Sequence, residues 1–495
     1  MLTESSGKYY SAAMILYLKH VFTLLIVLSL SVTCHAQDAL NTTTLENRVL
    51  GTAGQPLSDF RDLVRKETWT EKWPDDSDEI ETRSVTAEIW TAAMQASLDA
   101  QGLLHIPARE DPYYLDGPLI LKSGQSLTAD PQAEIRLKSG CNTCMVRNAN
   151  LTGFKDLPVP EDTNPDTDIH IEGGIWTTLA TARTASNGNV RGFSSKQNAV
   201  FGTHGVILLH NVRRVSVRNI TVRQSKPFAI HLGNAHDFTV DGLTLDDHRR
   251  DGVHVNGPAS HGVIRRVSGV SHDDPVALNA WEWKNYAPSC GPIHDVLVED
   301  VIGAPEGVPA ANAIRLLPGV KRFDDGTTLA CPLENITLRR ITDIREFKLY
   351  DQPNLELGRD KDFSIGVGTL KNIRFEDLVF NRPGKIELHA NTEGLAIKNV
   401  KLNFPVTPDH HLLAIGPKSQ TYKYGRSDDP SRWTEIFSPD LDCTVRNLSA
   451  SGVRTRDSQT DLPIEQVVNV IEQKLNPDYP KTTPKGGIGR GIWIR

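Results

Sequence analysis

A short pattern of alternating apolar and polar residues recurs along the middle of this chain and constrains its fold more than any other feature. Each copy is built around a turn-forming Asn, Asp or Gly, and successive copies lie about 23 to 40 residues apart. Alternation with a period of two indicates a β-strand that buries one face. The copies lie at 212–222, 236–245, 262–270, 294–302, 334–342, 371–380 and 394–402, with a weaker one at 443–448.

One such unit cannot bury its apolar face alone, so the copies must stack on one another. No helical pattern separates them, which excludes a sheet of βαβ units, and the shortest repeats are too short for a propeller blade of about 40–45 residues. We therefore predict an all-β fold, a right-handed parallel β-helix (solenoid), over residues 84–405. A β-sandwich with unequal loops is the alternative.

The flanks of the repeats fit a solenoid with covered ends. Residues 84–102 carry a helical pattern that stops at a Gly, and a helix there would cap the exposed strand edges of the first coil. The apolar segments 103–107 and 118–121 would open that coil. The remaining segments are an N-terminal extension (37–83) and an appended C-terminal cap or flap (406–495) with a second helix (463–475).

The N-terminus is typical of an export signal. A basic flank precedes the apolar run 21–30, and small residues follow up to Ala36, so residues 1–36 are predicted to be a signal peptide. Met14 is an alternative start, and a lipid anchor at Cys34 is the competing interpretation. No run of 18 apolar residues exists, so we expect no membrane span. The protein is predicted to be secreted or periplasmic.

Three carboxylates are spaced by one coil. Asp251 lies 22 residues before Asp273 and 23 before Asp274. Because stacked strands are about 4.7–4.9 Å apart, these side chains become lateral neighbours, and their mutual repulsion should raise at least one pKa. Carboxyls with separated pKa values are what glycosidic hydrolysis needs. A surface row of turn-capping Asp residues is the alternative. The histidines interleaved with this cluster are His248, His254 and His272.

The same residues resemble a known family. The segment DGVHV at 251–255, followed one coil later by DDPVAL at 273–278, is similar to the Asn-Thr-Asp-Gly and Gly-Asp-Asp motifs of the polygalacturonase family. That resemblance implies a parallel β-helix and inverting hydrolysis, with Asp274 as the general acid and with Asp251 and Asp273 holding the water. The resemblance in architecture extends over residues 85–405, and the motifs that are specific to the family lie within residues 246–316.

The chain also departs from that family. Arg249 and Arg250 stand at the Asn-Thr positions, the family's Gly-His-Gly coil is absent, and only Arg315 matches the Arg-Ile-Lys segment that grips a substrate carboxylate, Leu317 standing at the Lys position. The β-helical α-1,3-galactosidases are a second resemblance, because they carry an Asp-x-x-His strand one coil before Asp-Asp. The candidate substrate-binding residues are His254, His272, Arg250, Trp281, Lys284 and Arg315.

Charge and aromatic residues narrow the substrate class. With 54 Lys+Arg and 61 Asp+Glu the net charge is −7, which argues against nucleic-acid binding. Basic residues nevertheless gather near the acidic cluster, which favours an anionic glycan over a neutral one; solvated surface Arg is the alternative. Trp281 in the loop 279–286 would stack on a sugar, or simply pack under that loop. The other basic residues expected near the acidic cluster are Arg249, Lys321 and Arg322.

We thus predict an exported glycoside hydrolase that acts on a polysaccharide or oligosaccharide, such as a galacturonan or a sulfated galactan, without metal or cofactor. An exo-acting α-galactosidase and a β-helical polysaccharide lyase are alternatives, and the lyase would use calcium beside a uronate. A non-catalytic glycan-binding adhesin is a third. The sequence does not determine the sugar, the linkage, or endo against exo cleavage. Cys290 and Cys331 are candidates for a bridge between two long-loop coils.

Overall fold

The computed structural model of the chain describes residues 55–72, 82–141, 143–151, 153, 158–178, 205–282, 288–308, 312–323, 325–350, 368–407, 410–415, 419–423, 433–437, 444–470 and 493–494. The chain divides after Pro56 into two compact units, and every described helix and strand belongs to the unit from Leu57 to Arg495. The predicted signal peptide at 1–36, with Met14 and Cys34, lies outside the described residues, as does Lys284.

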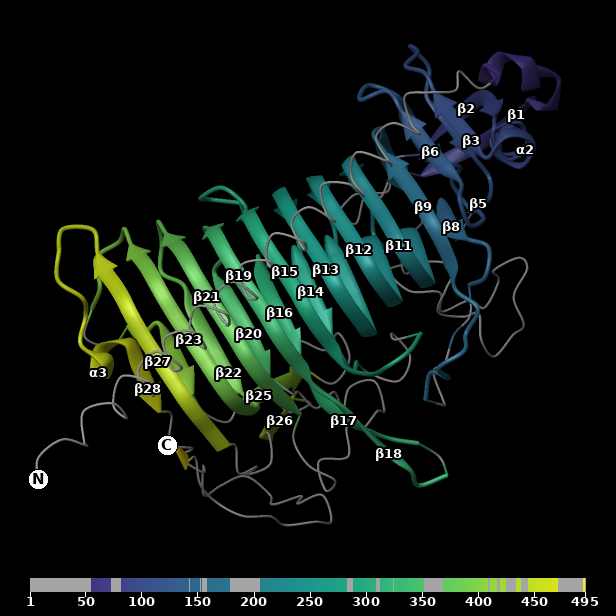
Figure 1. The fold of residues 1–495 in the computed structure, drawn as a ribbon. Helices are drawn as coiled ribbons and strands as arrows, with labels where there is room; N and C mark the ends of the chain where they lie inside the picture. Colours follow the sequence, from purple (N-terminus) through teal and green to yellow (C-terminus); the bar gives the residue numbers. More distant parts are fainter. Residues whose placement is uncertain are drawn as a thin grey trace, which may run out of the picture. The chain divides into compact units, whose positions relative to one another are not determined.

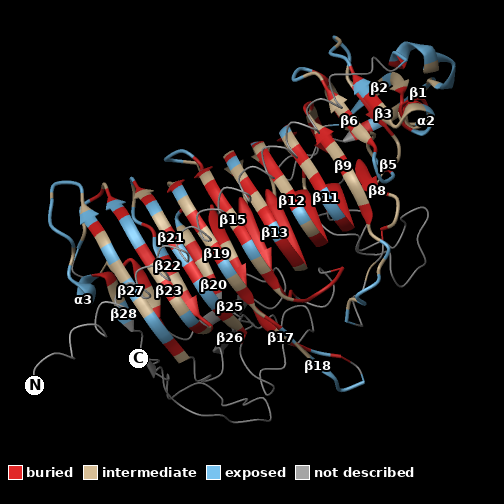
Figure 2. Cartoon of the chain, in the orientation of Figure 1, coloured by how far each residue is buried: buried red, intermediate tan, exposed pale blue. Residues whose placement is uncertain are grey.

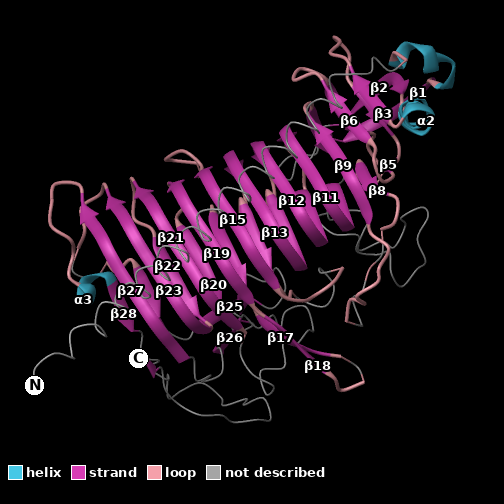
Figure 3. Cartoon of the chain, in the orientation of Figure 1, coloured by secondary structure: helices cyan, strands magenta, loops and turns pink. Residues whose placement is uncertain are grey.

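The unit from Leu57 onwards is the right-handed parallel β-helix that the repeats predict (Figure 1). Strands dominate the described residues, and helices occur only near the two ends of the strand series (Figure 3). A single 25-stranded sheet winds around the coils, so that each coil contributes to three ladders of parallel strands. Among the described residues, no helix is long and apolar enough to cross a membrane.

The first ladder holds the strands that the sequence repeats predicted. Its three long strands, β11, β12 and β13, continue into the other two ladders. Its members are β3 (Leu103–Ile106), β6 (Ser126–Ala129), β9 (Asp166–Glu172), β11 (Gly205–Arg223), β12 (Phe228–His248), β13 (Val253–Ser271), β15 (Ile293–Ile302), β19 (Leu333–Thr342), β21 (Thr369–Phe380), β23 (Asn391–Leu402), β27 (Thr444–Thr455) and β29 (Trp493–Ile494).

The second ladder consists of β2 (Thr82–Ile89), β4 (Tyr113–Leu115), β7 (Glu134–Leu137), β10 (Ile175–Thr178) and the C-terminal ends of the first-ladder strands from β11 to β27. The third ladder, called the site ladder below, consists of β5 (Leu119–Leu121), β8 (Val146–Asn148), the N-terminal ends of β11, β12 and β13, and then β14 (Val276–Asn279), β16 (Ala313–Leu317), β20 (Glu346–Tyr350), β22 (Lys385–His389), β24 (Leu413–Ile415) and β28 (Val468–Val470).

Three antiparallel hairpins and three short helical segments accompany the ladders. The hairpins pair β1 (Arg65–Lys72) with β2, β17 (Gly319–Arg322) with β18 (Thr328–Cys331), and β25 (Ser419–Lys423) with β26 (Trp433–Phe437). The helical segments are η1 (Leu57–Leu63), α2 (Thr91–Gln101) and α3 (Ile464–Val467).

The recurring Asn, Asp and Gly of the sequence pattern stand where the chain turns from one ladder to the next. Equivalent corners of three different coils are occupied by Asn219, Gly242 and Asp300, whose φ angles are positive at 51°, 83° and 55°, respectively. Asn and Asp tolerate this left-handed conformation better than other side chains, and Gly adopts it freely. The turn residues therefore fix the length of each strand segment and keep successive coils in register.

Apolar side chains of successive coils stack in the interior of the solenoid. Buried and more exposed positions alternate along the first-ladder strands (Figure 2). Parallel pairing without offset brings equivalent positions of neighbouring coils into contact, which gives each unit the buried partner that it lacks alone. One such buried stack consists of Val217, Val240, Ile264, Val298, Leu338, Phe375 and Ile397.

Three expectations about the ends are wrong in part. Residues 84–89 belong to β2, because β-branched Val85 and Thr86 pair with β1, so the capping helix α2 spans only Thr91–Gln101 before Gly102 ends it with a φ of 71°. Within the described part of the predicted helix at 463–475, which ends at residue 470, α3 has a single turn, because Val468 begins a strand that pairs with β24. Strands β24, β27 and β28 continue the ladders, so the solenoid extends beyond residue 405.

Candidate active site

The site ladder brings one residue from each of five coils into one row, and four of these residues are polar. Its strands pair without offset, so side chains at equivalent positions lie on the same face of neighbouring strands. The short strands β14, β16 and β20 each contribute one residue, although loops of very different length separate them in sequence. The row consists of His231, His254, Ala277, Arg315 and Lys348.

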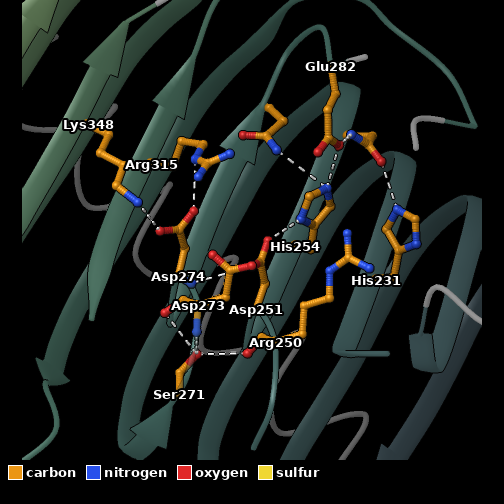
Figure 4. Close-up of polar contacts among 12 residues, drawn as sticks. His231, Arg250, Asp251, His254, Ser271, Asp273, Asp274, Glu282, Arg315 and Lys348 are labelled. Carbon is orange, nitrogen blue, oxygen red and sulfur yellow. Dashed lines mark hydrogen bonds and ion pairs between the residues drawn. The ribbon is translucent and has the colours of Figure 1, made fainter. Parts of the chain in front are cut away.

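Three carboxylates converge beside this row, as the spacing predicts. Asp251 precedes β13, and the Asp273–Asp274 pair precedes β14. The ladder already begins at these turns, because the Gly252 amide donates to the Asp274 carbonyl at 3.0 Å. One carboxylate oxygen of each Asp lies within 4.8 Å of the other two (Figure 4). Asp251 and Asp274 are buried, 4% and 0% exposed, whereas Asp273 remains partly exposed.

Asp274 is held between two cations. Nε of Arg315 lies 2.8 Å from its Oδ2, and Nζ of Lys348 lies 2.9 Å from its Oδ1. The structure thus brings the predicted Arg315 to the acidic cluster. Sequence reasoning missed Lys348, which follows Arg315 after the β17–β18 hairpin, on the next strand of the ladder.

The Asp273 carboxyl is the member of the cluster that favours its protonated form. Burial, and then the negative charge of Asp251, raise the pKa of Asp273, while Arg315, Arg250 and Lys348 partly oppose the rise. Its backbone is fixed by Ser271, whose Oγ accepts a hydrogen bond from the Asp273 amide at 3.2 Å and lies 2.7 Å from the Arg250 carbonyl. The sequence argument predicts a raised pKa for at least one of the three carboxyls, and Asp273 is the one whose surroundings raise its pKa.

His254 joins Asp251 to a second buried acid. Its Nδ1 lies 2.6 Å from Oδ2 of Asp251, and its Nε2 lies 2.9 Å from Oε2 of Glu282 (Figure 4). Burial alone would lower the pKa of His254, but the charges and hydrogen bonds of the two carboxylates raise it to about 9. Burial opposes ionisation of Glu282 as well, yet the charge of His254 lowers the pKa of that carboxyl. The three groups thus form a buried carboxylate–imidazolium–carboxylate chain.

The backbone on either side of Asp251 is also held in place. Nε2 of buried His248 donates to the Asp251 carbonyl at 3.0 Å. Burial lowers the pKa of His248 to about 3, so this ring is neutral at physiological pH and serves as a fixed donor. The Arg250 guanidinium lies over the ring of Phe228, with Cζ 4.3 Å from its centroid, and His254 stacks on the same ring at 3.8 Å.

Other predicted binding residues lie elsewhere. His272 contacts Asp247, with Nε2 2.8 Å from Oδ1, and so is bound to a neighbouring ion pair instead of the three carboxylates. Of the two interpretations of Trp281, the structure supports packing: the side chain is 6% exposed and lies in the core against Gly319, where a side chain at residue 319 would collide with the indole. Lys321 is also mostly buried, over Phe323.

The carboxylate cluster is a poor match for a metal ion. Among the described residues, Asp251, Asp273 and Asp274 are the one group of His, Cys, Asp and Glu whose ligand atoms converge closely. Carboxylate oxygens suit calcium. Both oxygens of Asp274, however, already face the positive groups of Arg315 and Lys348, which would repel a divalent cation. We therefore assign no metal to this site.

Comparison with known proteins finds similar structures but no similar sequence. No protein-family model matches it, and no curated protein matches its sequence. Among solved structures it is similar to the family 28 exopolygalacturonase of Yersinia enterocolitica, with 13% identity over 82% of this chain and 83% of that one and a TM-score of 0.42. The hyperthermoactive exopolygalacturonase of Thermotoga maritima has 12% identity over 76% and 90% of the two chains, with a TM-score of 0.42.

The mannuronan C-5 epimerase AlgE4 A-module of Azotobacter vinelandii is similar to a comparable degree, with 12% identity over 82% of this chain and 93% of that one and a TM-score of 0.39. The similar structures thus include members of the family that the sequence motifs resemble. At these identities the likeness concerns the fold alone, so the functional argument depends on the side chains of the site.

Proposed function

We propose that this protein is an exported glycoside hydrolase that cleaves glycosidic bonds of a polysaccharide by acid–base catalysis at Asp251, Asp273 and Asp274. The observation that carries the proposal is the convergence of three carboxylates with unlike surroundings within 4.8 Å. One has a raised pKa, and the other two are in contact with cations. Glycoside hydrolysis needs such a division, a protonated donor for the leaving oxygen and a charged partner for water.

The surroundings of each carboxylate favour different roles from those implied by the family resemblance. Asp273 is the better general acid, because its pKa is raised and its side chain is partly exposed, where a glycosidic oxygen could reach it. Asp274 is fully buried and paired with two cations, which suits a charged group more than a proton donor. We therefore assign the acid to Asp273, and the positioning and activation of water to Asp251 and Asp274.

The stereochemical outcome stays a prediction from the resemblance. The carboxylate oxygens approach more closely than the roughly 6.5–9.5 Å that is usual between the carboxyl groups of inverting enzymes. Their spacing therefore does not by itself favour inversion. Proton NMR of the anomer released first from a hydrolysed glycan would measure the outcome directly.

An anionic glycan is the substrate class that we propose, as a galacturonan or a sulfated galactan. Arg250, Arg315 and Lys348 bring three permanent positive charges to the carboxylate cluster, and Arg is suited to planar anionic groups. A lyase would need a base and, in its calcium-dependent form, a cation beside the uronate. The cations already on Asp274 make the hydrolase the better fit to this site.

The experiment is a substrate screen with the purified mature protein. Pectic, carrageenan and α-galactoside substrates are incubated with the wild type and with Asp273→Asn, and new reducing ends are measured. A hydrolase releases reducing ends that the variant does not release. Release of an ultraviolet-absorbing unsaturated product would identify a lyase instead. Glycan binding without cleavage, equal in both proteins, would identify an adhesin.

A further inference from the structure

Glu282 is a buried acid without a role in the proposed division of labour among the Asp residues. It follows β14, is 3% exposed, and lies in the loop 279–286, where the sequence pattern points to Trp281 and assigns no task to an acid. Its Oε2 accepts hydrogen bonds from Nε2 of His254 at 2.9 Å and from Nδ2 of Asn256 at 3.2 Å. An acid removed from water costs free energy unless it is paired, so these contacts are what keep it charged inside the protein.

Polar and charged groups face His254 from the neighbouring strands and turns. Asp251 and Glu282 contact its two ring nitrogens from the turn before β13 and from the segment after β14. His231 on β12 meets the imidazole edge to face at 5.1 Å, and Nδ2 of Asn279 on β14 lies 3.5 Å from Nε2. Arg250 shares the Phe228 ring, and Arg315 follows in the row on β16. Within this environment, the two acids are the groups that favour a positive charge on His254.

We propose that Glu282 is a positioning residue for the proposed hydrolysis, which acts through His254: it holds the imidazole as a cation pinned against Asp251, and thereby fixes Asp251 as an oriented carboxylate beside Asp273. This inference rests on the proposed function, since it gives Glu282 a task in that reaction. Glu282 and Asp251 contact opposite nitrogens of the His254 ring, so the effect of Glu282 on Asp251 is transmitted by the imidazole.

The physical reason is that desolvation opposes a charged imidazole, and the two carboxylates overcome it together. Burial is the largest influence on His254 and favours the neutral ring, and the charge of Glu282 is the largest influence that opposes it. Without that charge, desolvation should prevail and His254 should lose its proton at neutral pH. The hydrogen bond to Asp251 could persist with a neutral ring, but it would lose the strength that the charge confers.

The test uses Glu282→Gln, which keeps the shape and a hydrogen-bonding group but removes the charge. In isotope-labelled histidine NMR of the folded protein, the His254 signal, assigned by its loss in His254→Gln, should titrate near 9 in the wild type. In Glu282→Gln its midpoint should fall below about 6.5, the value of a free imidazole. On a glycan that the wild type cleaves, kcat should fall roughly 10–100-fold, as when an orienting partner is removed, with KM changed less than about threefold.

Two further variants separate charge from structure. Glu282→Asp keeps the negative charge and should retain a raised His254 midpoint and most of kcat, and it also serves if the Gln variant does not fold. Glu299→Gln is the matched control, because Glu299 is another buried acid, 5% exposed, that pairs with Arg339 and Arg340 and contacts none of the site residues named here. It should change neither the His254 titration nor kcat.

The inference is overturned if His254 titrates alike in wild type and Glu282→Gln, or if Glu299→Gln lowers kcat as strongly. Failure of the proposed function is a separate result: a wild type that cleaves no glycan rejects the hydrolase. In that case, a lowered His254 midpoint in Glu282→Gln would still support the electrostatic coupling, and an unchanged midpoint would reject it.

Discussion

Replacing Asp273 with Asn tests whether this carboxyl is the proton donor, because the substitution keeps the shape and removes the ionisable group. A positioned general acid contributes about 10²–10⁴-fold to the rate, which equals about 2.7–5.4 kcal/mol of barrier. We expect kcat to fall by this factor on a natural glycan. An aryl glycoside with an acidic phenol needs little protonation of its leaving group, so Asp273→Asn should lose much less activity on it, whereas Asp274→Asn should lose activity on both.

The same substitution should stabilise the fold at neutral pH. Burial and Asp251 raise the pKa of Asp273 in the folded state. A carboxyl with a raised folded-state pKa supports stability below its unfolded pKa of about 3.9, and this support is lost as pH rises through the folded-state pKa. At a pH above the folded-state pKa, each unit by which the pKa of Asp273 is raised lowers the stability of the wild type by about 1.4 kcal/mol. Asn does not ionise and so avoids this loss.

Steady-state kinetics on both substrates and urea unfolding at about pH 3.5 and 7 check these expectations together. Asp246→Asn is the control, because that carboxyl is 46% exposed and forms a surface ion pair with Arg223. It should change kcat less than about threefold, as exposed pairs contribute little. The reasoning is refuted if Asp273→Asn loses equal activity on both substrates, or if it is less stable than the wild type at neutral pH.

Three more predictions follow from the site and its surroundings. Lys348→Met removes one of the two cations on buried Asp274 and should lower the free energy of unfolding by about 1–3 kcal/mol, measured by urea titration. Because the pKa of His254 is raised to about 9, its charged form stabilises the fold by about 3 kcal/mol below about pH 6.5. This stabilisation should be lost as the pH rises through 9, and His254→Gln should abolish this pH dependence of the free energy of unfolding. The buried thiols of Cys290 and Cys331 are adjacent, since a hydrogen bond from Cys331 lowers the pKa of Cys290. Under oxidising conditions we expect them to join, which peptide mapping without reductant would show, and a pair of freely alkylated thiols after oxidation would contradict it.

The sequence predicted the parts of this molecule that depend on regular repetition. The corner positions of the solenoid prefer Asn, Asp and Gly, so the first-ladder strands could be located from their pattern, and with them the fold. Asp251, Asp273 and Asp274 could be brought together from spacing alone because no insertion separates their coils. Their individual roles could not, since burial and the cations around each carboxyl decide which one holds a proton.

What the sequence missed lies beyond irregular loops. Lys348 is 33 residues after Arg315, with the β17–β18 hairpin between them, so no constant period could reveal that they are neighbours. Glu282 lies past the end of β14, in no strand, and nothing in its spacing marks it. Residues 84–89 continue the helical pattern of the segment that follows them. Their conformation is decided instead by pairing with β1, a strand that no sequence repeat marks.

The row from His231 to Lys348 implies that residues of the site can be replaced one at a time. Each of its residues belongs to a different coil, and the interior stacks that support those coils are formed by other positions. Ala277, the small residue between His254 and Arg315, is the natural place to begin, although it is fully buried, so that a longer group there must fit among the side chains of the site. A new glycan preference could in this way arise by single replacements along one row of the site ladder, while the architecture that carries it is inherited unchanged.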